Sequence, residues 1–77
     1  AGAYDGMPNE IDEEHTHEFD TKLVILSGTI HIKTLLSGAM TDFDLRTGDK
    51  IEIPKNQIHS TVVGPDGCRY VVAEKTV

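Results

Sequence analysis

Residues 23–33 read LVILSGTIHIK, and this stretch decides the fold class. Its first four residues form a continuous apolar run that a Ser-Gly pair ends, which predicts a short strand covered on both faces. Ile30 and Ile32 then alternate with polar residues, which is typical of a half-buried strand. Because Ile30 and Ile32 are expected to face the core, His31 between them is expected to face outward and not to bind metal.

The same kind of pattern continues after this stretch. Turn-forming residues recur at intervals of roughly ten residues, and short alternating apolar segments lie between them. These turn signals fall at residues 37–38, 47–49, 55–56 and 64–67. No window of about 11 residues sustains the i, i+3, i+4, i+7 spacing of an amphipathic helix. We therefore expect an all-β sandwich or barrel.

The chain is short, with 77 residues and a single cysteine, Cys68. A chain of this size holds one domain at most and buries only about 60% of the surface that its unfolded form exposes. One cysteine cannot form an intrachain disulfide, so metal binding and self-association are the remaining sources of extra stability. We expect a homodimer, the commonest closed assembly, and a structural role for Cys68.

The charge balance indicates which partners to expect. Thirteen acidic and seven basic side chains give a formal charge of −6, which repels nucleic acid phosphates and anionic membrane surfaces. No stretch approaches the ~18 to 20 consecutive apolar residues of a membrane span. An unpaired cysteine is typical of a reducing compartment, so the expected location is the cytoplasm. Neither nucleic acid nor a membrane is an expected partner.

His15 and His17 stand two residues apart, a spacing that places both imidazoles on one face of an extended strand. Imidazole nitrogen is a common ligand of transition metals, so the pair is a candidate metal site. Histidine pairs of this kind also occur on protein surfaces without a metal. The pair therefore needs support from elsewhere in the sequence.

Two longer spacings supply that support. After His17, a four-residue segment and six further residues lead to Gly28. Later in the chain, Gly48 is followed after five residues by Pro54, and His59 comes five positions beyond that proline. Glycine adopts positive φ without steric cost, and proline ends a strand because it has no N–H to donate. Both patterns thus have a structural reason as well as a candidate ligand.

These spacings resemble the two motifs of the cupin family. The first motif is His-x-His, three or four residues, Glu, six residues and Gly; the second is Gly, five residues, Pro-x-Gly, two residues and His. The resemblance covers about residues 14–75. It implies an all-β fold, a small cupin-type double-stranded β-helix, or jelly-roll, barrel. It also implies that His15, His17 and His59 bind one divalent metal ion inside this barrel.

The resemblance divides the chain into two parts. Residues 1–14 are polar and acidic, and we expect them to form an N-terminal polar arm or an edge strand. Residues 15–77 are expected to form the cupin barrel domain. The four acidic residues between positions 10 and 14 are expected to be a solvated segment whose negative potential draws cations toward the site.

The sequence departs from the family pattern at two positions. Asn56 stands where the second motif usually has Gly, and Asn is one of the few other residues that tolerate left-handed backbone angles. Thr21 stands where the first motif has its ligating Glu. The alternative spacing puts Lys22 there, and a charged Lys cannot bind a cation. Glu18 and Asp20 lie close by in the sequence, and either is a candidate replacement.

The resemblance and these departures lead to a ligand hypothesis. Some cupin dioxygenases, including those that resemble cysteine dioxygenase, use three histidines without the Glu. An ion held by three neutral imidazoles keeps its full 2+ charge and favours a small, anionic, chelating ligand. Imidazole suits Fe, Zn, Ni, Co or Cu, whereas Mn prefers oxygen ligands and is less expected. Thr21 is the candidate substrate-binding residue, because its hydroxyl could hydrogen-bond a substrate oxygen.

Three functions remain open from the sequence. The chain could be a metal-dependent oxygenase or isomerase that acts on a small anionic substrate, with its catalytic residues unassigned. It could be a non-catalytic cupin that binds or senses a ligand, or a structural dimer without metal. Because one cupin barrel supports many unrelated activities, the resemblance does not choose among them.

Overall fold

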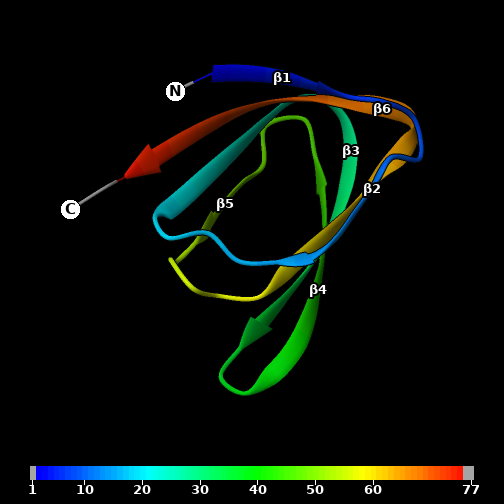
Figure 1. Cartoon of the computed structure of the whole chain (residues 1–77). Helices are drawn as coiled ribbons and strands as arrows, with labels where there is room; N and C mark the ends of the chain where they lie inside the picture. The colour runs from blue at the N-terminus through cyan, green and yellow to red at the C-terminus, as the bar shows by residue number, and fades with distance from the viewer. Residues whose placement is uncertain (1, 76–77) are drawn as a thin grey trace.

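The computed structural model describes residues 2–75 and is built from strands alone (Figure 1). Ala1, the first residue of the predicted arm, and residues 76–77, the last of the predicted barrel domain, lie outside the described residues. The strands are β1 (Gly2–Gly6), β2 (Ile11–His15), β3 (Asp20–Leu36), β4 (Ala39–Arg46), β5 (Lys50–Ile53) and β6 (His59–Lys75). Among the described residues, no helix is long and apolar enough to cross a membrane.

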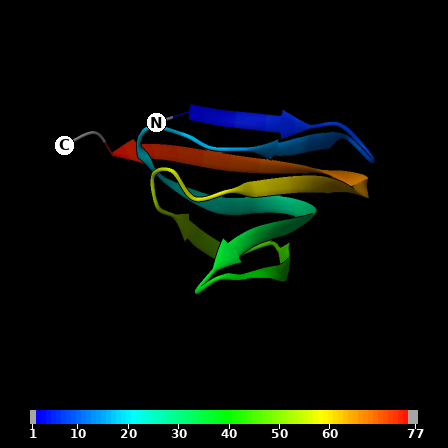
Figure 2. The same ribbon diagram turned by 60° about the horizontal axis from the view of Figure 1, so that its bottom comes forward.

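The two longest strands, β3 and β6, organise the sheet. They have 17 residues each and pair with one another antiparallel, from Asp20↔Lys75 to Thr34↔His59. On the other side of β3, the first half pairs with β5 and the second half with β4. On the other side of β6, β1 and β2 pair in the same way. Figure 2 shows β1 and β2 on one side of this central pair and β4 and β5 on the other.

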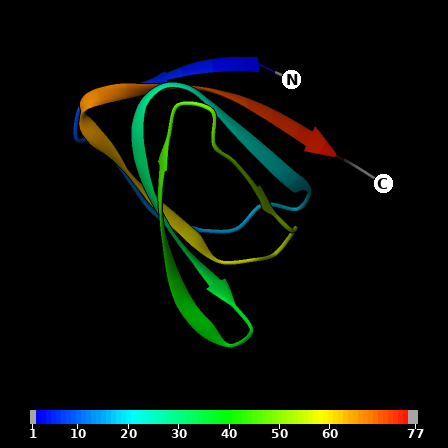
Figure 3. The same ribbon diagram turned by 180° about the vertical axis from the view of Figure 1, so that it is seen from behind.

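The sheet does not close on itself within residues 2–75. Its strand order is β1-β6-β3-β4, with β2 on β6 and β5 on β3, and no pairing joins β1 or β2 to β4 or β5. Seen from both sides, the β3–β4 hairpin also projects beyond the body of the barrel (Figures 1 and 3). The sheet therefore keeps free edges, which are open to pairing with another chain.

The central pair bends where the sequence predicted turns. Residues 27–28 and 64–67 were expected to end strands, but they lie inside β3 and β6. The β3–β6 register shifts between Ile25 and Ser27 and again between Gly28 and Ile30, and Gly28 has φ 78°. A Cβ atom on Gly28 would clash with the carbonyl oxygen of Gly67. Glycine here serves a bulge, which bends and twists a strand without ending it.

The remaining predicted turns are confirmed. Residues 37–38, 47–49 and 55–56 connect strands, and both Gly48 and Asn56 have positive φ, at 90° and 63°. Asn56 therefore holds the left-handed conformation that its position requires. The backbone N–H of Asn56 donates to the carbonyl of His17 at 2.8 Å, which ties the second motif to the first.

The core lies between the two halves of the folded sheet. Eight residues form it: Leu23, Ile25, Ile30, Ile32, Leu45, Ile53, Val63 and Cys68. Burial raises the pKa of the Cys68 thiol, which favours its protonated form. The apolar run that opens β3 is not covered on both faces, because Leu26 is 45% exposed while Ile25 is buried. An open antiparallel sheet covers one face of each strand, so even this run alternates.

Residues 2–15 contribute two strands to the same sheet. β1 pairs with the second half of β6, and β2 pairs with the first half, so the polar N-terminal segment supplies edge strands. The boundary expected between residues 14 and 15 falls inside β2. β2 is short, and the structure places the first predicted ligand, His15, at its last position.

Candidate metal centre

Three histidines from three parts of the chain meet at one end of the barrel. His15 ends β2, His59 begins β6, and the two are paired across the strands; His17 lies in the segment between β2 and β3. One ring nitrogen from each lies within 4.8 Å of those of the other two. The ring centroids of His15 and His59 are 4.2 Å apart, and His17 lies at 4.9 and 5.0 Å from them.

Backbone carbonyls orient two of these rings. Nδ1 of His15 lies 2.6 Å from the carbonyl oxygen of Glu13, and Nδ1 of His59 lies 3.1 Å from that of Gln57. A carbonyl oxygen only accepts hydrogen bonds, so each Nδ1 carries the proton and donates. In the neutral ring, Nε2 then keeps a free lone pair, as in metal-binding histidines whose other nitrogen bonds to the protein.

Two further contacts position His17 and keep His59 neutral. The His17 ring stacks on Phe19, with centroids 5.2 Å apart and an interplanar angle of 18°. Burial lowers the pKa of His59 below its ordinary value. The hydrogen bond to Gln57 acts in the opposite direction but less strongly, and the still smaller effects of His15 and His17 lower the pKa further. A neutral imidazole is the form that binds a metal.

The donor set fits a divalent transition ion. Metal–nitrogen bonds are about 2.0–2.1 Å long, so two nitrogens on one ion can be at most ~4.2 Å apart. Nitrogens within 4.8 Å of one another reach that separation through small rotations of the rings. Three imidazoles leave coordination positions free, which is the arrangement of catalytic sites and not of closed structural ones.

A cavity of about 190 Å³ opens beside the three histidines. The predicted substrate residue Thr21 lines it and is only 6% exposed, and its Oγ1 is buried without a hydrogen-bond partner. The cavity is lined by Tyr4, Asp12, His15, His17, Phe19, Thr21, Leu23, Ile30, Ile32, Ile53, His59, Thr61, Tyr70, Val72 and Glu74. Most of the surface of this cavity is apolar, and it also carries polar groups, as in small-molecule sites generally.

Solved structures of other proteins share this architecture. No protein-family model matches the chain. No curated protein matches it in sequence. Among solved structures, the Drosophila melanogaster CENP-C cupin domain matches with a TM-score of 0.85 and 19% identity, over 95% of this chain and 58% of that one. A variant of Bacillus subtilis oxalate decarboxylase matches with a TM-score of 0.88 and 19% identity, over 95% of this chain and 20% of that one. The chain has the cupin fold.

At this level of identity, the likeness shows the fold alone. The chain spans somewhat less than three fifths of the CENP-C chain and a fifth of the decarboxylase chain. The two neighbours also differ in kind. The decarboxylase has Mn(II) centres, whereas the CENP-C domain has been solved bound to CAL1. The two neighbours therefore assign no function to this chain.

Neither candidate replaces the missing Glu of the cupin motif. The carboxylate of Asp20 accepts a hydrogen bond from the backbone N–H of Lys55 at 2.9 Å, so it holds the turn before β6. Glu18 is exposed, and neither residue lines the cavity. Among residues 2–75, the cluster of candidate ligands that contains the histidines has no carboxylate.

Asp12 also lines the cavity, which was not predicted from the sequence. Strict alternation along β2 would put Asp12 and His15 on opposite faces. The pairs Asp12↔Thr61 and His15↔His59 show an extra residue on β2, and this register shift turns both side chains inward. The Asp12 carboxylate accepts a hydrogen bond from the Thr61 hydroxyl at 3.4 Å. No signal in the sequence marks this bulge.

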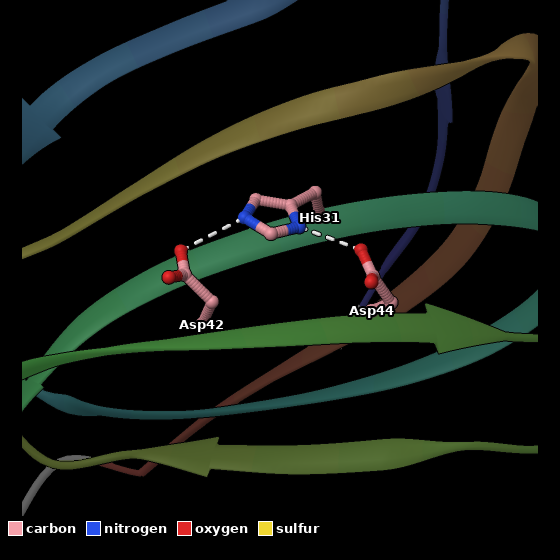
Figure 4. Close-up of polar contacts among 3 residues, drawn as sticks. All are labelled: His31, Asp42 and Asp44. Atoms are coloured by element: carbon pink, nitrogen blue, oxygen red, sulfur yellow. Dashed lines mark hydrogen bonds and ion pairs between the residues drawn. The ribbon is translucent and has the colours of Figure 1, made fainter.

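His31 lies on the outer surface and outside the metal cluster, as its position in β3 predicted. Figure 4 shows its ring between two aspartates of β4: Nδ1 lies 2.6 Å from Asp44 and Nε2 lies 2.9 Å from Asp42. Hydrogen bonds to Asp44 and then to Asp42 raise the pKa of His31 above its ordinary value. Both ring nitrogens are therefore engaged as donors when the ring is protonated.

Proposed function

We propose that this cupin binds one divalent transition metal through His15, His17 and His59 and binds a small chelating ligand in the adjoining cavity. The observation that carries the proposal is the convergence of three histidine nitrogens beside a cavity of about 190 Å³. Carbonyl bonds to two of the rings leave Nε2 free to bind the ion. Oxygenase or isomerase chemistry on the bound molecule is the activity class that such a site supports best.

The proposed division of labour follows from the residues. A divalent ion with open positions supplies Lewis acidity to a ligand oxygen. No carboxylate is among the protein groups that would hold the ion. The atom of the small molecule that binds the ion is therefore expected to be anionic. Thr21 offers its unpartnered hydroxyl to the ligand, and the apolar side chains around it, including Leu23 and Ile53, exclude water.

The proposal names a set of metals for testing. Imidazole ligands suit Fe, Zn, Ni, Co and Cu. Mn prefers oxygen ligands, but the oxalate decarboxylase that shares the fold has Mn(II) centres, so Mn belongs in the same trial. Competition among these ions, at equal concentration and neutral pH, ranks them.

Metal content of the purified protein tests the site. We expect about one ion per chain in the wild type and in His31→Ala, and loss of stoichiometric metal in His15→Ala, His17→Ala and His59→Ala. Metal is also expected to dissociate as pH falls below ~6.5, the reference value for imidazole, because a protonated ring cannot ligate. Equal metal in all four variants and the wild type would exclude the assignment.

A second candidate function is a non-catalytic binding module. The specific observation in its favour is that a CENP-C cupin domain, which matches this chain with a TM-score of 0.85, has been solved in complex with another protein. The free sheet edges of this chain suit such a role. Oxygen uptake by the metal-loaded protein with small chelating acids favours the enzyme, and metal binding without turnover favours the module.

A further inference from the structure

Apart from the three histidines, the charged residues that line the cavity are acidic. Asp12 and Glu74 contribute carboxylates, and none of the fifteen lining residues is Lys or Arg. The chain as a whole carries a formal charge of −6. An anionic group of a ligand that does not contact the metal therefore finds no counter-ion among the lining residues, whereas a cationic group finds two carboxylates.

One part of this lining is built to accept hydrogen bonds from a ligand. Thr21 and Glu74 are paired across β3 and β6, so their side chains lie on the same face with Cβ atoms ~4.5–5.5 Å apart. Among the described residues, Thr21 Oγ1 is the one buried side-chain oxygen or nitrogen without a hydrogen-bond partner. A hydroxyl and a carboxylate both accept from N–H donors, and an ammonium group has three such donors.

We infer that the cavity selects a small molecule that carries a protonated amine besides its metal-binding group, with the amine held by Thr21 and Glu74, and that it discriminates against dicarboxylates. The inference rests on the proposed function, because the other end of the ligand binds the metal. A cavity of about 190 Å³ is smaller than the ~300–1,000 Å³ of sites for drug-sized molecules, which suits a ligand of few non-hydrogen atoms. An ω-amino acid has this size and charge pattern.

Three probes of matched length test the inference on the Co(II)-loaded protein. β-Alanine, butyrate and succinate share a carboxylate and a two-methylene spacer, and they end in an ammonium, a methyl and a second carboxylate. Titration is followed by the visible spectrum of Co(II) and by calorimetry at neutral pH. We expect β-alanine to bind about tenfold or more tightly than butyrate, and succinate to bind most weakly. Equal or tighter binding of butyrate or succinate would overturn the inference.

Two charge-neutralising variants then locate the amine. Glu74→Gln is expected to remove most of the preference for β-alanine over butyrate, because it removes the paired charge. Glu74 and Glu52 are both exposed, but Glu52, on β5, does not line this cavity, so Glu52→Gln is expected to keep the preference. A preference that survives in Glu74→Gln sinks the assignment to this residue pair.

Failure of the proposed function and failure of the inference give different experimental results. A wild-type chain that takes up no Co(II) at its histidines overturns the proposed function, and the inference with it. A chain that takes up Co(II) with the same dependence on His15, His17 and His59 but shows no preference for an amine overturns the inference alone.

Discussion

Thr21→Val is expected to make the ligand-free protein more stable while weakening ligand binding. The Thr21 hydroxyl is buried without a partner, and an unpaired buried hydroxyl costs about 1–3 kcal/mol relative to its hydrated state. Valine has nearly the same shape, packs equally well on a strand and has no polar atom to desolvate. We expect the free energy of unfolding to rise by about 1–2 kcal/mol, which in a domain of this size raises Tm by about 4–8 °C per kcal/mol.

Thr34→Val provides the matched control. Thr34 lies on the same strand and is 1% exposed, but its hydroxyl donates to the carbonyl of Ile58 at 3.0 Å and accepts from Nε2 of Gln57 at 2.7 Å. Its removal leaves both partners unsatisfied, so we expect a loss of about 1–3 kcal/mol. Chemical denaturation of the metal-free proteins measures both changes. If Thr21→Val destabilises the fold as much as Thr34→Val does, the Thr21 hydroxyl is bonded in the folded chain and the reasoning is refuted.

Three other predictions concern pH, backbone conformation and assembly. Asp44 and Asp42 raise the pKa of His31 in the folded chain. The ion pairs of His31 therefore stabilise the fold fully below pH ~6.5, the pKa in the unfolded chain, and this stabilisation is lost as pH rises through the folded pKa. Since the His31 side chain is 39% exposed, His31→Gln is expected to lower the free energy of unfolding by at most about 1 kcal/mol near pH 5 and to leave it unchanged near pH 9. Denaturation midpoints that show the opposite trend with pH would contradict this. Gly28→Ala places a methyl group against a backbone carbonyl of β6. It is expected to destabilise the fold by well over the ~1 kcal/mol of Gly38→Ala, because Gly38 has a similar φ but open space around it. Equal melting temperatures of the two variants would show that the bulge relaxes freely. The free edges of the sheet are expected to support a homodimer, so a species of 8.4 kDa at every concentration in sedimentation equilibrium would exclude it.

The fold class could be predicted from the sequence because period-two alternation and turn residues are local signals. Ile30 and Ile32 are buried as their alternation predicted, and Gly48 and Asn56 adopt positive φ where the motif required it. The continuity of β3 and β6 could not be predicted in the same way. Gly28 looks like the end of a strand, and only its close contact with the opposite strand makes it a bend within one.

The candidate site shows the same division between local and long-range information. His15, His17 and His59 stand at motif spacings, so the sequence could nominate them together, and the structure brings them together. Asp12 turns inward only because of a register shift on β2. Glu74 lines the cavity because β6 pairs with β3, and this pairing joins residues that are far apart in the chain. Neither carboxylate has a signal in its neighbouring sequence.

The nested pairing of β3 with β6 sets an order in which the molecule can assemble. Thr34↔His59 is the innermost pair and Asp20↔Lys75 the outermost, so these two strands can join progressively outward from the segment between Thr34 and His59, which holds β4 and β5. His59 takes its place at the start of this process, whereas His15 and His17 precede β3 and arrive only when β2 docks on β6. A bound ion would therefore join β2 and the segment after it to the start of β6. It is expected to slow the release of β2, measured by amide hydrogen exchange, more than the opening of the central pair.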